Sequence, residues 1–157
     1  MHSKRNRRRA RAGQQTDHGF SMIELLVVLV ILAILAAIEY PSYKESVRKA
    51  RRAEGRAALL ALMQQQERYY SQNSTYVAFS STAENGFKWF SAESAASSSY
   101  EISAAPCKDD TIQNCVELTA EPGTPKVNAN YKDEICWNLS LTSTGIRKAS
   151  GAAAHCW

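Results

Sequence analysis

The feature that most constrains this chain is an apolar run over residues 20–38 that contains a single charged side chain, Glu24. The run is long enough to cross the hydrocarbon core of a membrane, which takes about 20 apolar residues in a helix. A carboxylate in such a segment is costly, so it marks a functional site and requires a cationic partner. The run itself holds no cation, but cleavage after Gly19 would create one, the free α-amine of Phe20 on a neighbouring copy of the helix.

The junction at Gly19 has a distinctive pattern. A basic leader ends in glycine, an aromatic residue follows, an acid stands at the fifth position of the new N-terminus, and an aliphatic run comes next. This pattern resembles the class III signal of type IV prepilins, in which a membrane aspartic peptidase removes the leader on the cytoplasmic side and methylates the new N-terminal residue. The resemblance implies cleavage between Gly19 and Phe20, N-methylation of Phe20, and an assembly charge pair between Glu24 and Phe20 of a neighbouring subunit.

Two other interpretations of the apolar run explain less of it. An ordinary secretory signal would need a small-residue cleavage site after the run, and cutting after Ala37 would place Leu35 at a position that favours small residues. A plain single-span anchor explains the hydrophobicity and the basic flank. A plain anchor does not explain Glu24 or Gly19.

The leader departs from the commonest prepilin pattern, because Asp17 and His18 stand beside the glycine where many leaders have Lys or Arg. Its basic cluster can be interpreted as a nucleic-acid patch. The positive-inside rule favours a simpler role, in which the cluster holds this end in the cytoplasm. The cluster consists of Lys4, Arg5, Arg7, Arg8, Arg9 and Arg11.

Without the leader, 13 basic and 14 acidic residues remain, for a formal net charge of −1. The positive charge that remains is local and forms a basic collar just after the apolar run. The collar can contact lipid headgroups, acidic residues of neighbouring subunits or DNA, and a solvated helix face is the commonest outcome for such a pattern. Its members are Lys44, Arg48, Lys49, Arg51, Arg52 and Arg56.

The rest of the sequence predicts an α+β fold. Helix-forming residues dominate from residue 42 to about Tyr70, and one face carries Leu59, Leu62, Met63, Gln66, Tyr69 and Tyr70 at three-to-four spacing. Pro41 would normally break a helix, although a membrane helix tolerates it as a kink, and the prepilin resemblance favours one continuous helix. Gly55 is the weak point of this helix, and Asn73 begins the segment that stops it.

Short β-prone segments follow the helix, at residues 100–103, 115–119, 135–141 and 146–148. They predict a small antiparallel sheet, with the outer half of the long helix packed on one face. The pilin resemblance implies three parts: a removed leader (1–19), the transmembrane and fibre-core half of the helix (20–40), and a periplasmic or extracellular domain that includes the second half of the helix (41–157). The course of residues 80–99 is not predicted; within them Phe87, Trp89 and Phe90 have the character of core residues.

The cysteines Cys107, Cys115, Cys136 and Cys156 all lie in the last third of the chain. An even number in an exported region predicts disulfides. Three connectivities are open, and chain order favours Cys107 with Cys115 and Cys136 with Cys156. The second pair resembles the C-terminal disulfide loop of type IV pilins. A zinc site is the alternative, but the sequence has no Cys-x-x-Cys pair and only His155 nearby.

Catalysis has little support in the sequence. The three histidines are His2, His18 and His155, and two of them lie in the leader, so no histidine-based triad is easily assembled. The acid pairs at 109–110 and 133–134 are expected to be solvated turn residues. The sequence therefore predicts a protein that is not an enzyme, with no cofactor and no metal.

The function that follows is a structural subunit of a type IV pilus, of the minor pilin kind, that takes part in pilus assembly and so in adhesion and twitching motility. The expected partners are the prepilin peptidase, major and minor pilins, the inner-membrane assembly platform and lipid before assembly. The expected location is the bacterial inner membrane as a single-pass precursor, then the pilus fibre. Two alternatives stay open: a type II secretion pseudopilin, and a DNA-receptor minor pilin for natural transformation, whose only sequence support is the basic collar.

Overall fold

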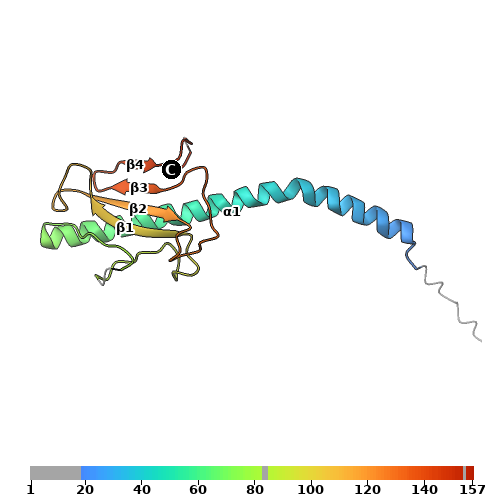
Figure 1. Ribbon diagram of the computed structural model, residues 1–157, viewed down its shortest axis with the longest axis horizontal. Helices are drawn as coiled ribbons and strands as arrows, with labels where there is room; N and C mark the ends of the chain where they lie inside the picture. Colours follow the sequence, from blue (N-terminus) through green and yellow to red (C-terminus); the bar gives the residue numbers. More distant parts are fainter. Residues whose placement is uncertain (1–18, 83–84, 154) are drawn as a thin grey trace, which may run out of the picture. The chain divides into compact units, whose positions relative to one another are not determined.

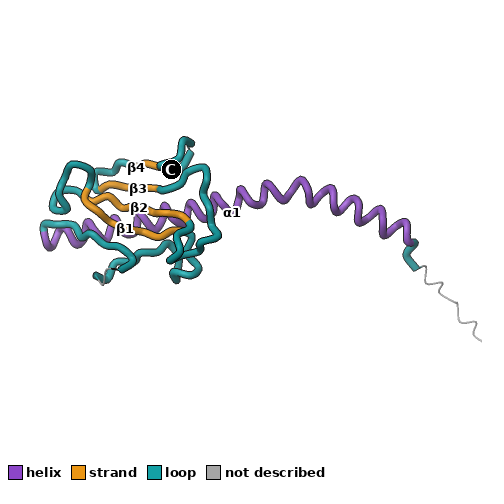
Figure 2. The backbone as a smooth tube through the Cα atoms, viewed as in Figure 1, coloured by secondary structure: helices purple, strands orange, loops and turns teal. Residues whose placement is uncertain are grey.

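A computed structural model of the chain describes residues 19–82, 85–153 and 155–157. Its first element is a single long helix, α1 (Met22–Asn73), of 52 residues (Figures 1 and 2). The helix continues through Pro41, as the prepilin resemblance implied. It ends where Ser74 adopts a left-handed backbone with φ of 55°. The chain divides into two compact units, Met1–Pro41 and Ser42–Trp157, and α1 contributes residues to both.

The second unit contains a four-stranded antiparallel sheet. Its strands are β1 (Tyr100–Pro106), β2 (Val116–Pro122), β3 (Leu139–Thr142) and β4 (Arg147–Ala149), paired in the order β1-β2-β3-β4. The part of α1 that belongs to this unit lies along one face of the sheet (Figures 1 and 2). The predicted α+β class, with a long N-terminal helix packed on a small antiparallel sheet, is confirmed.

One predicted strand is shorter than expected. The segment 135–141 enters the sheet only at Leu139, because the residues before it form a turn in which Trp137 has a left-handed backbone with φ of 54°. Alternating side chains in this segment gave a strand-like pattern, but the turn contains Cys136, which is joined to Cys156 by a disulfide. A covalent bond between distant residues has therefore overridden local β propensity.

The core lies between α1 and the sheet. Four of the six residues predicted on the inner helix face are buried, whereas Tyr69 and Tyr70 remain about a third exposed at the end of the helix. Alternate residues of β1 and β2 supply the other side of the core, as the period of a strand requires. The largest contributors are Leu59, Leu62, Met63, Tyr100, Ile102, Val116, Leu118, Leu139 and Leu141.

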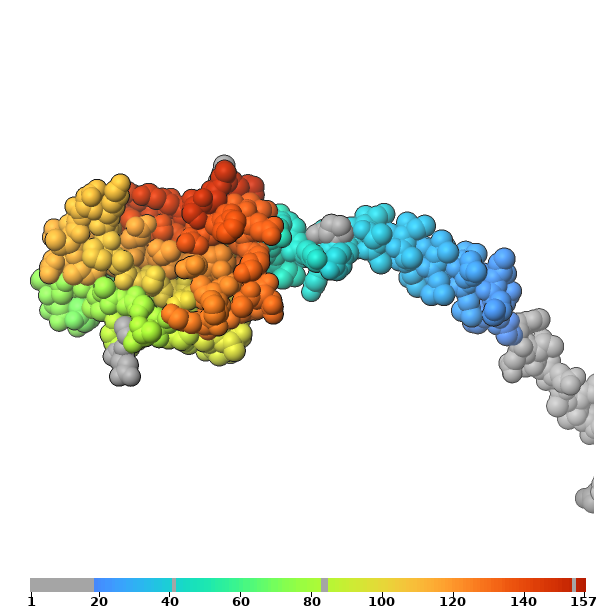
Figure 3. Space-filling view, viewed as in Figure 1, coloured from blue at the N-terminus to red at the C-terminus, as the bar shows by residue number. Residues whose placement is uncertain are grey.

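The long connection between α1 and β1 follows the sheet edge without forming a full strand. Isolated bridges join Phe79 to Ala104 and Phe90 to Glu101. The side chain of Gln66, fully buried on α1, fixes the start of this connection by accepting a hydrogen bond from the Val77 amide and donating one to the Val77 carbonyl (2.9 and 2.7 Å). At the edge of the sheet opposite β1, β3 and β4 lie beside the C-terminal residues (Figure 3, orange-red to red).

Gly55, the predicted weak point of the helix, is where the Tyr100 ring of β1 packs against α1. A Cβ atom at this position would lie 2.9 Å from Cδ2 of the Tyr100 ring. Tyr100 is completely buried and its hydroxyl donates a hydrogen bond to Asp133, so the ring has little freedom to move away. The glycine therefore weakens the helix locally but allows the sheet to pack against it.

We predict that Gly55→Ala destabilises the protein, although alanine is the better helix former. Overpacking against a fixed ring costs about 1–3 kcal/mol, whereas the gain in helix propensity is about 1 kcal/mol. Thermal unfolding of the full chain in detergent, followed by circular dichroism, measures the difference. Ala57→Gly at an exposed position of the same helix isolates the propensity contribution. A higher melting temperature for Gly55→Ala would contradict the packing explanation.

Candidate functional site

The methylation-type junction lies at the start of α1. Phe20 is 77% exposed, and the carbonyl of Ser21 accepts hydrogen bonds from the amides of Glu24 and Leu25 (3.0 and 3.2 Å), which begins the helix. Glu24 stands in the first turn, where a negative charge is favoured by the helix dipole. The leader residues 1–18, including the basic cluster, lie outside the described residues. The structure holds one copy of the chain, so the pairing of Glu24 with a neighbouring Phe20 stays a prediction.

The first part of α1 exposes an almost continuous apolar surface. Every large aliphatic side chain from Met22 to Ile38 is at least 47% exposed. Within the described residues, α1 is the one helix long and apolar enough to cross a membrane. Length and composition alone are weak evidence for a span, since a signal sequence has the same properties; Glu24 at the junction is the more specific observation.

Two arginines of the basic collar form ion pairs with acids on the same helix. Arg48 forms an ion pair with Glu45 (2.8 Å) and Arg51 forms one with Glu54 (3.2 Å), each one turn along the same helix. Such partly exposed pairs contribute little to stability. They do lower the positive charge that these two arginines can offer to a partner.

Arg52 is not part of the contact surface proposed for the collar, and this assignment was wrong. The side chain is 2% exposed and forms a buried ion pair with Asp133. Its Nε and Nη2 atoms donate to the two carboxylate oxygens at 2.9 and 2.8 Å. A buried guanidinium with a bidentate partner is unavailable to lipid, DNA or another subunit.

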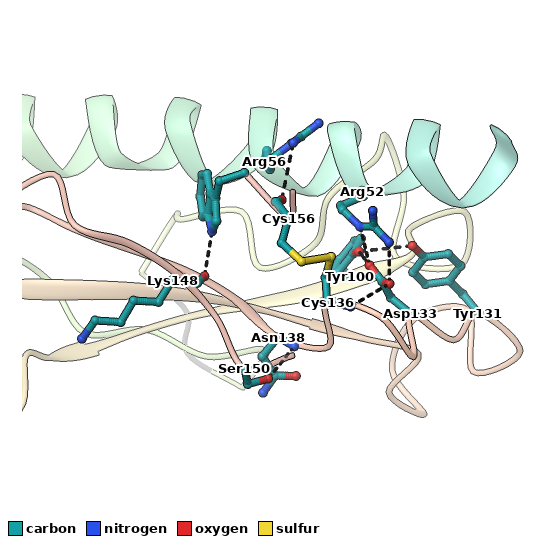
Figure 4. Close-up of a disulfide and its surroundings, with 11 residues drawn as sticks. Arg52, Arg56, Tyr100, Tyr131, Asp133, Cys136, Asn138, Lys148, Ser150 and Cys156 are labelled. Carbon is teal, nitrogen blue, oxygen red and sulfur yellow. Dashed lines mark hydrogen bonds and ion pairs between the residues drawn. A yellow bond between two sulfur atoms is a disulfide. The ribbon is translucent and has the colours of Figure 1, made fainter. Parts of the chain in front are cut away.

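Asp133 is the centre of a buried polar cluster (Figure 4). Besides Arg52, it accepts hydrogen bonds from the Tyr100 hydroxyl (2.9 Å) and from the Cys136 amide (3.2 Å). The hydroxyls of Tyr100 and Tyr131 lie 3.2 Å apart. The expectation that Asp133 is a solvated turn residue was wrong, because the turn folds inward and buries it against α1.

The protonation states of the cluster follow from burial and pairing. Burial alone would raise the pKa of Asp133, but hydrogen bonds from Arg52, the Cys136 amide and Tyr100 outweigh it and lower the pKa. The hydrogen bond to Asp133 raises the pKa of Arg52. Burial, with the hydrogen bond to Tyr131, raises the pKa of Tyr100, so the phenol stays neutral. The cluster thus holds one cation and one anion.

A basic hollow lies beside this cluster, lined by Lys49, Arg52, Arg56 and His155, with a volume of about 400 Å³. Asp133 compensates the charge of Arg52, so Lys49 and Arg56 carry the net charge of the hollow. Arg56 also donates a hydrogen bond to the carbonyl of Cys156 (3.4 Å; Figure 4). The hollow is therefore built by the helix and by the C-terminal segment together.

The disulfides have the pairing that chain order favoured, Cys107 with Cys115 and Cys136 with Cys156. No cysteine in the described part of the chain is free, and sulfur atoms in a disulfide cannot serve as thiolate ligands for zinc. Among the same residues, no group of three or more His, Cys, Asp or Glu side chains is arranged to hold a metal. The Asp110 carboxylate instead accepts hydrogen bonds from the Thr111 amide and from Asn114 within the 107–115 loop.

The C-terminal residues are fixed to both α1 and the sheet. The indole of Trp157 donates to the Lys148 carbonyl (2.7 Å), and Arg147 lies 5.7 Å from the centre of its ring. The Asn138 amide donates a hydrogen bond to the Ser150 hydroxyl, and the Ser150 amide donates one to the Asn138 carbonyl (Figure 4). The Cys136–Cys156 disulfide is thus one of several interactions that hold the C-terminal segment in place.

The chain is similar to known proteins in both its N-terminal segment and its folded unit. Residues 41–140 match the sequence model of the family described as type IV minor pilin ComP, DNA uptake sequence receptor. Residues 15–38 match the prokaryotic N-terminal methylation motif, which confirms the resemblance to prepilins. A comparison with curated proteins gave no match.

The solved structures that are similar to the chain include two pilins. One is a type IV pilin from Shewanella oneidensis, with 28% sequence identity and a TM-score of 0.44 over 70% of this chain and 97% of that one. The other is the non-core minor pilin PilV from Neisseria meningitidis, with 26% identity and a TM-score of 0.46 over 71% of this chain and 94% of that one.

We predict that Asp133→Asn lowers the free energy of unfolding by about 3–5 kcal/mol, because it leaves the Arg52 guanidinium buried without a counter-charge. Glu45→Gln, which breaks an exposed pair on the same helix, is the matched control and should cost at most about 1 kcal/mol. Denaturant unfolding of the full chain in detergent compares the two variants.

The ion pair between Arg52 and Asp133 also makes the stability of the fold depend on pH. The pKa of Asp133 is lowered on folding, so its stabilisation is complete well above the unfolded value of about 3.9 and is lost as the pH falls through the lower folded value. The stability difference between wild type and Asp133→Asn should therefore shrink below about pH 4. An equal difference at pH 3 and pH 7 would show that the charge of Asp133 is not what stabilises the fold.

Proposed function

The chain belongs to the family of the type IV minor pilin ComP, and we propose that it enters a pilus through its N-terminal helix and binds DNA through the basic hollow. As a type IV minor pilin it is a structural subunit. The methylation motif and the apolar start of α1 support a membrane-anchored precursor that later joins a fibre. A role in adhesion and twitching motility would follow from membership of the pilus.

Assembly is proposed to depend on the junction at Gly19. A prepilin peptidase would remove residues 1–19 and methylate Phe20, leaving residues 20–40 to anchor the precursor in the inner membrane and then to pack in the fibre core. Glu24 would meet the Phe20 amine of an adjacent subunit, and this attraction is much stronger in an apolar fibre core than in water. The observation that supports this route is the carboxylate in the first turn of a helix whose large aliphatic side chains from Met22 to Ile38 are all exposed.

DNA binding is the second part of the proposal, and two observations favour it. The matched family is described as a DNA uptake sequence receptor. The basic hollow also presents Lys49 and Arg56 without an ion pair among the described residues. Phosphate neutralisation by such cations supplies most of the affinity of non-specific DNA binding. The secretion pseudopilin, the other alternative expected from sequence, has no comparable support.

The contacts with DNA are assigned to Lys49, Arg56 and His155. Lys49 and Arg56 lie two helical turns apart on one face of α1, and His155 reaches the hollow from the C-terminal segment. Arg48 and Arg51 are assigned a smaller part, since Glu45 and Glu54 compensate their charges. Arg52 is assigned no contact with DNA, because its side chain is buried.

We predict that Glu24→Leu accumulates in the inner membrane but is depleted from sheared pili. The substitution makes the segment more hydrophobic, so membrane insertion is retained. It removes the anion that would pair with the neighbouring Phe20 amine. Immunoblots of membrane and pilus fractions measure both pools.

Intact-mass analysis of the same membrane fraction is the control, since it reports whether the variant is still cleaved before Phe20 and methylated. Glu39→Leu, an acid at the far end of the apolar run, is the matched variant. Entry of processed Glu24→Leu into pili at the wild-type level would exclude the charge-pair mechanism.

For DNA, we predict that Lys49→Gln weakens binding and lowers the slope of log affinity against log salt by about 0.9 for each phosphate that the protein no longer neutralises. Arg56→Lys, which keeps the charge, should preserve most of that slope. Fluorescence anisotropy of a labelled duplex with the full chain in detergent measures both quantities. Lys88→Gln makes the same charge change on the α1–β1 connection. If Lys88→Gln weakened binding as much as Lys49→Gln, the basic hollow would not be the DNA site.

A further inference from the structure

A second hollow in the folded unit has an exposed tryptophan in its wall. It lies between the segment 121–125 at the end of β2 and the turn that precedes β3, and it is lined by 121–125, 132–134, Trp137 and Asn138. Its volume of about 360 Å³ falls in the range of about 300–1,000 Å³ typical of ligand sites. We call it the Trp137 pocket.

Trp137 is held in an unfavourable state in two respects. Its side chain is 56% exposed, although a large aromatic ring is favoured in the core. Its backbone has a φ of 54°, a left-handed conformation that costs free energy for any residue other than glycine. Both costs fall on one residue in a concave part of the surface, and such outliers are typical of binding sites.

Hydrogen bonds and a disulfide on both sides of Trp137 hold its backbone in this conformation. The Trp137 amide donates to the Asp133 carbonyl at 2.8 Å, and Asp133 is itself fixed by Arg52. On one side Cys136 is bound to Cys156, and on the other the Asn138 amide donates to the Ser150 hydroxyl at 3.0 Å (Figure 4). The backbone that carries the indole is therefore held in place before any ligand arrives, which lowers the entropy cost of ordering this turn on binding.

The opposite wall of the pocket is also fixed. Gly123 has a φ of 64°, and a Cβ atom at this position would overlap the carbonyl oxygen of Tyr131. Because only glycine allows this approach, segment 121–125 packs directly against the chain at Tyr131. This close approach holds the wall formed by segment 121–125 in place.

Charge selects the class of ligand. Glu121 and Glu134 are exposed in the lining, and neither forms an ion pair with a cation of the described residues. Lys132 is the one cation in the lining, and Asp133 is already neutralised by Arg52. The formal charge of the lining is then −1, which disfavours a phosphate-bearing ligand and favours a cation. An indole face also attracts cations.

We propose that the Trp137 pocket binds a guanidinium or alkylammonium group, presented as an arginine or lysine side chain of a partner protein. The cation lies against the indole of Trp137, and Glu121 and Glu134 supply the counter-charge. The site is separate from the basic hollow, so it stands whether or not the protein binds DNA. For a subunit that works in an assembly of proteins, it is a contact point for a basic segment.

The test uses the full chain in nonionic detergent, labelled with 5-fluorotryptophan, so that fluorine NMR reports Trp137 apart from Trp89 and Trp157. The Trp137 signal is assigned with Trp137→Phe. N-acetylarginine amide is the probe, and choline, methyl glucoside and dAMP are the comparisons. We expect N-acetylarginine amide to shift the Trp137 signal in a saturable way, choline to do so less, and the other two compounds to leave it in place.

Charge variants then test the recognition itself. Glu121→Gln and Glu134→Gln should each weaken binding of N-acetylarginine amide, and Lys132→Gln should strengthen it. Trp137→Leu should weaken it about two- to fivefold, as expected when an exposed cation–π interaction is removed, measured by calorimetry. Glu93→Gln, an exposed acid in the 91–99 loop, is the matched control and should change nothing.

Three results would overturn the proposal. The first is a Trp137 signal that N-acetylarginine amide does not shift. The second is an affinity for this probe that is the same in the Glu121→Gln and Glu134→Gln variants as in wild type. The third is a larger shift with methyl glucoside or dAMP, which would assign the pocket to a sugar or a nucleotide instead. Circular dichroism checks the fold of each variant with its disulfides formed. A spectrum equal to that of wild type excludes misfolding as the cause of these outcomes.

Discussion

The buried ion pair between Arg52 and Asp133 is the interaction on which the rest of the folded unit depends. It joins α1 to the turn before β3, and both partners are 2% exposed. Burying two charges is costly unless each is paired and hydrogen-bonded, and this cluster meets that condition with a bidentate contact and two further donors. The register of the turn on the helix follows from it, because a displaced Asp133 would leave Arg52 without a counter-charge.

Two surface features share this pair as their common wall. Arg52 lines the basic hollow, and Asp133 lines the Trp137 pocket. The neutralised pair adds no net charge to either, so the sign of each surface is set by its other members: Lys49 and Arg56 in the hollow, Glu121 and Glu134 in the pocket. A small pilin domain thus presents a cationic and an anionic contact surface on the two sides of one salt bridge.

The disulfide between Cys136 and Cys156 acts together with the ion pair. A covalent bridge restricts the unfolded chain and so stabilises the folded one, typically by about 2–4 kcal/mol. Here it also holds the C-terminal segment against Arg56 and keeps Trp137 in a conformation that the free chain would avoid. Surface segments that carry function are often held in this way by a rigid scaffold.

The sequence by itself determined what depends on neighbours along the chain. The Gly19–Phe20–Glu24 junction, the helix-forming composition after residue 42 and the alternation in β1 and β2 are local patterns. Chain order favoured the disulfide pairing that the structure shows, and the prepilin resemblance favoured a helix that continues through Pro41. Tertiary structure decided what depends on residues far apart. Arg52 and Asp133 are 81 positions apart, so no local pattern distinguishes them from a collar residue and a solvated turn acid. In the same way, Gly55 looked like a flaw in the helix until Tyr100 packed against it, and Trp137 looked like part of a strand until the bridge at Cys136 turned the chain. In each case a contact between distant segments outweighed local propensity, and such contacts leave no periodic signal in the sequence.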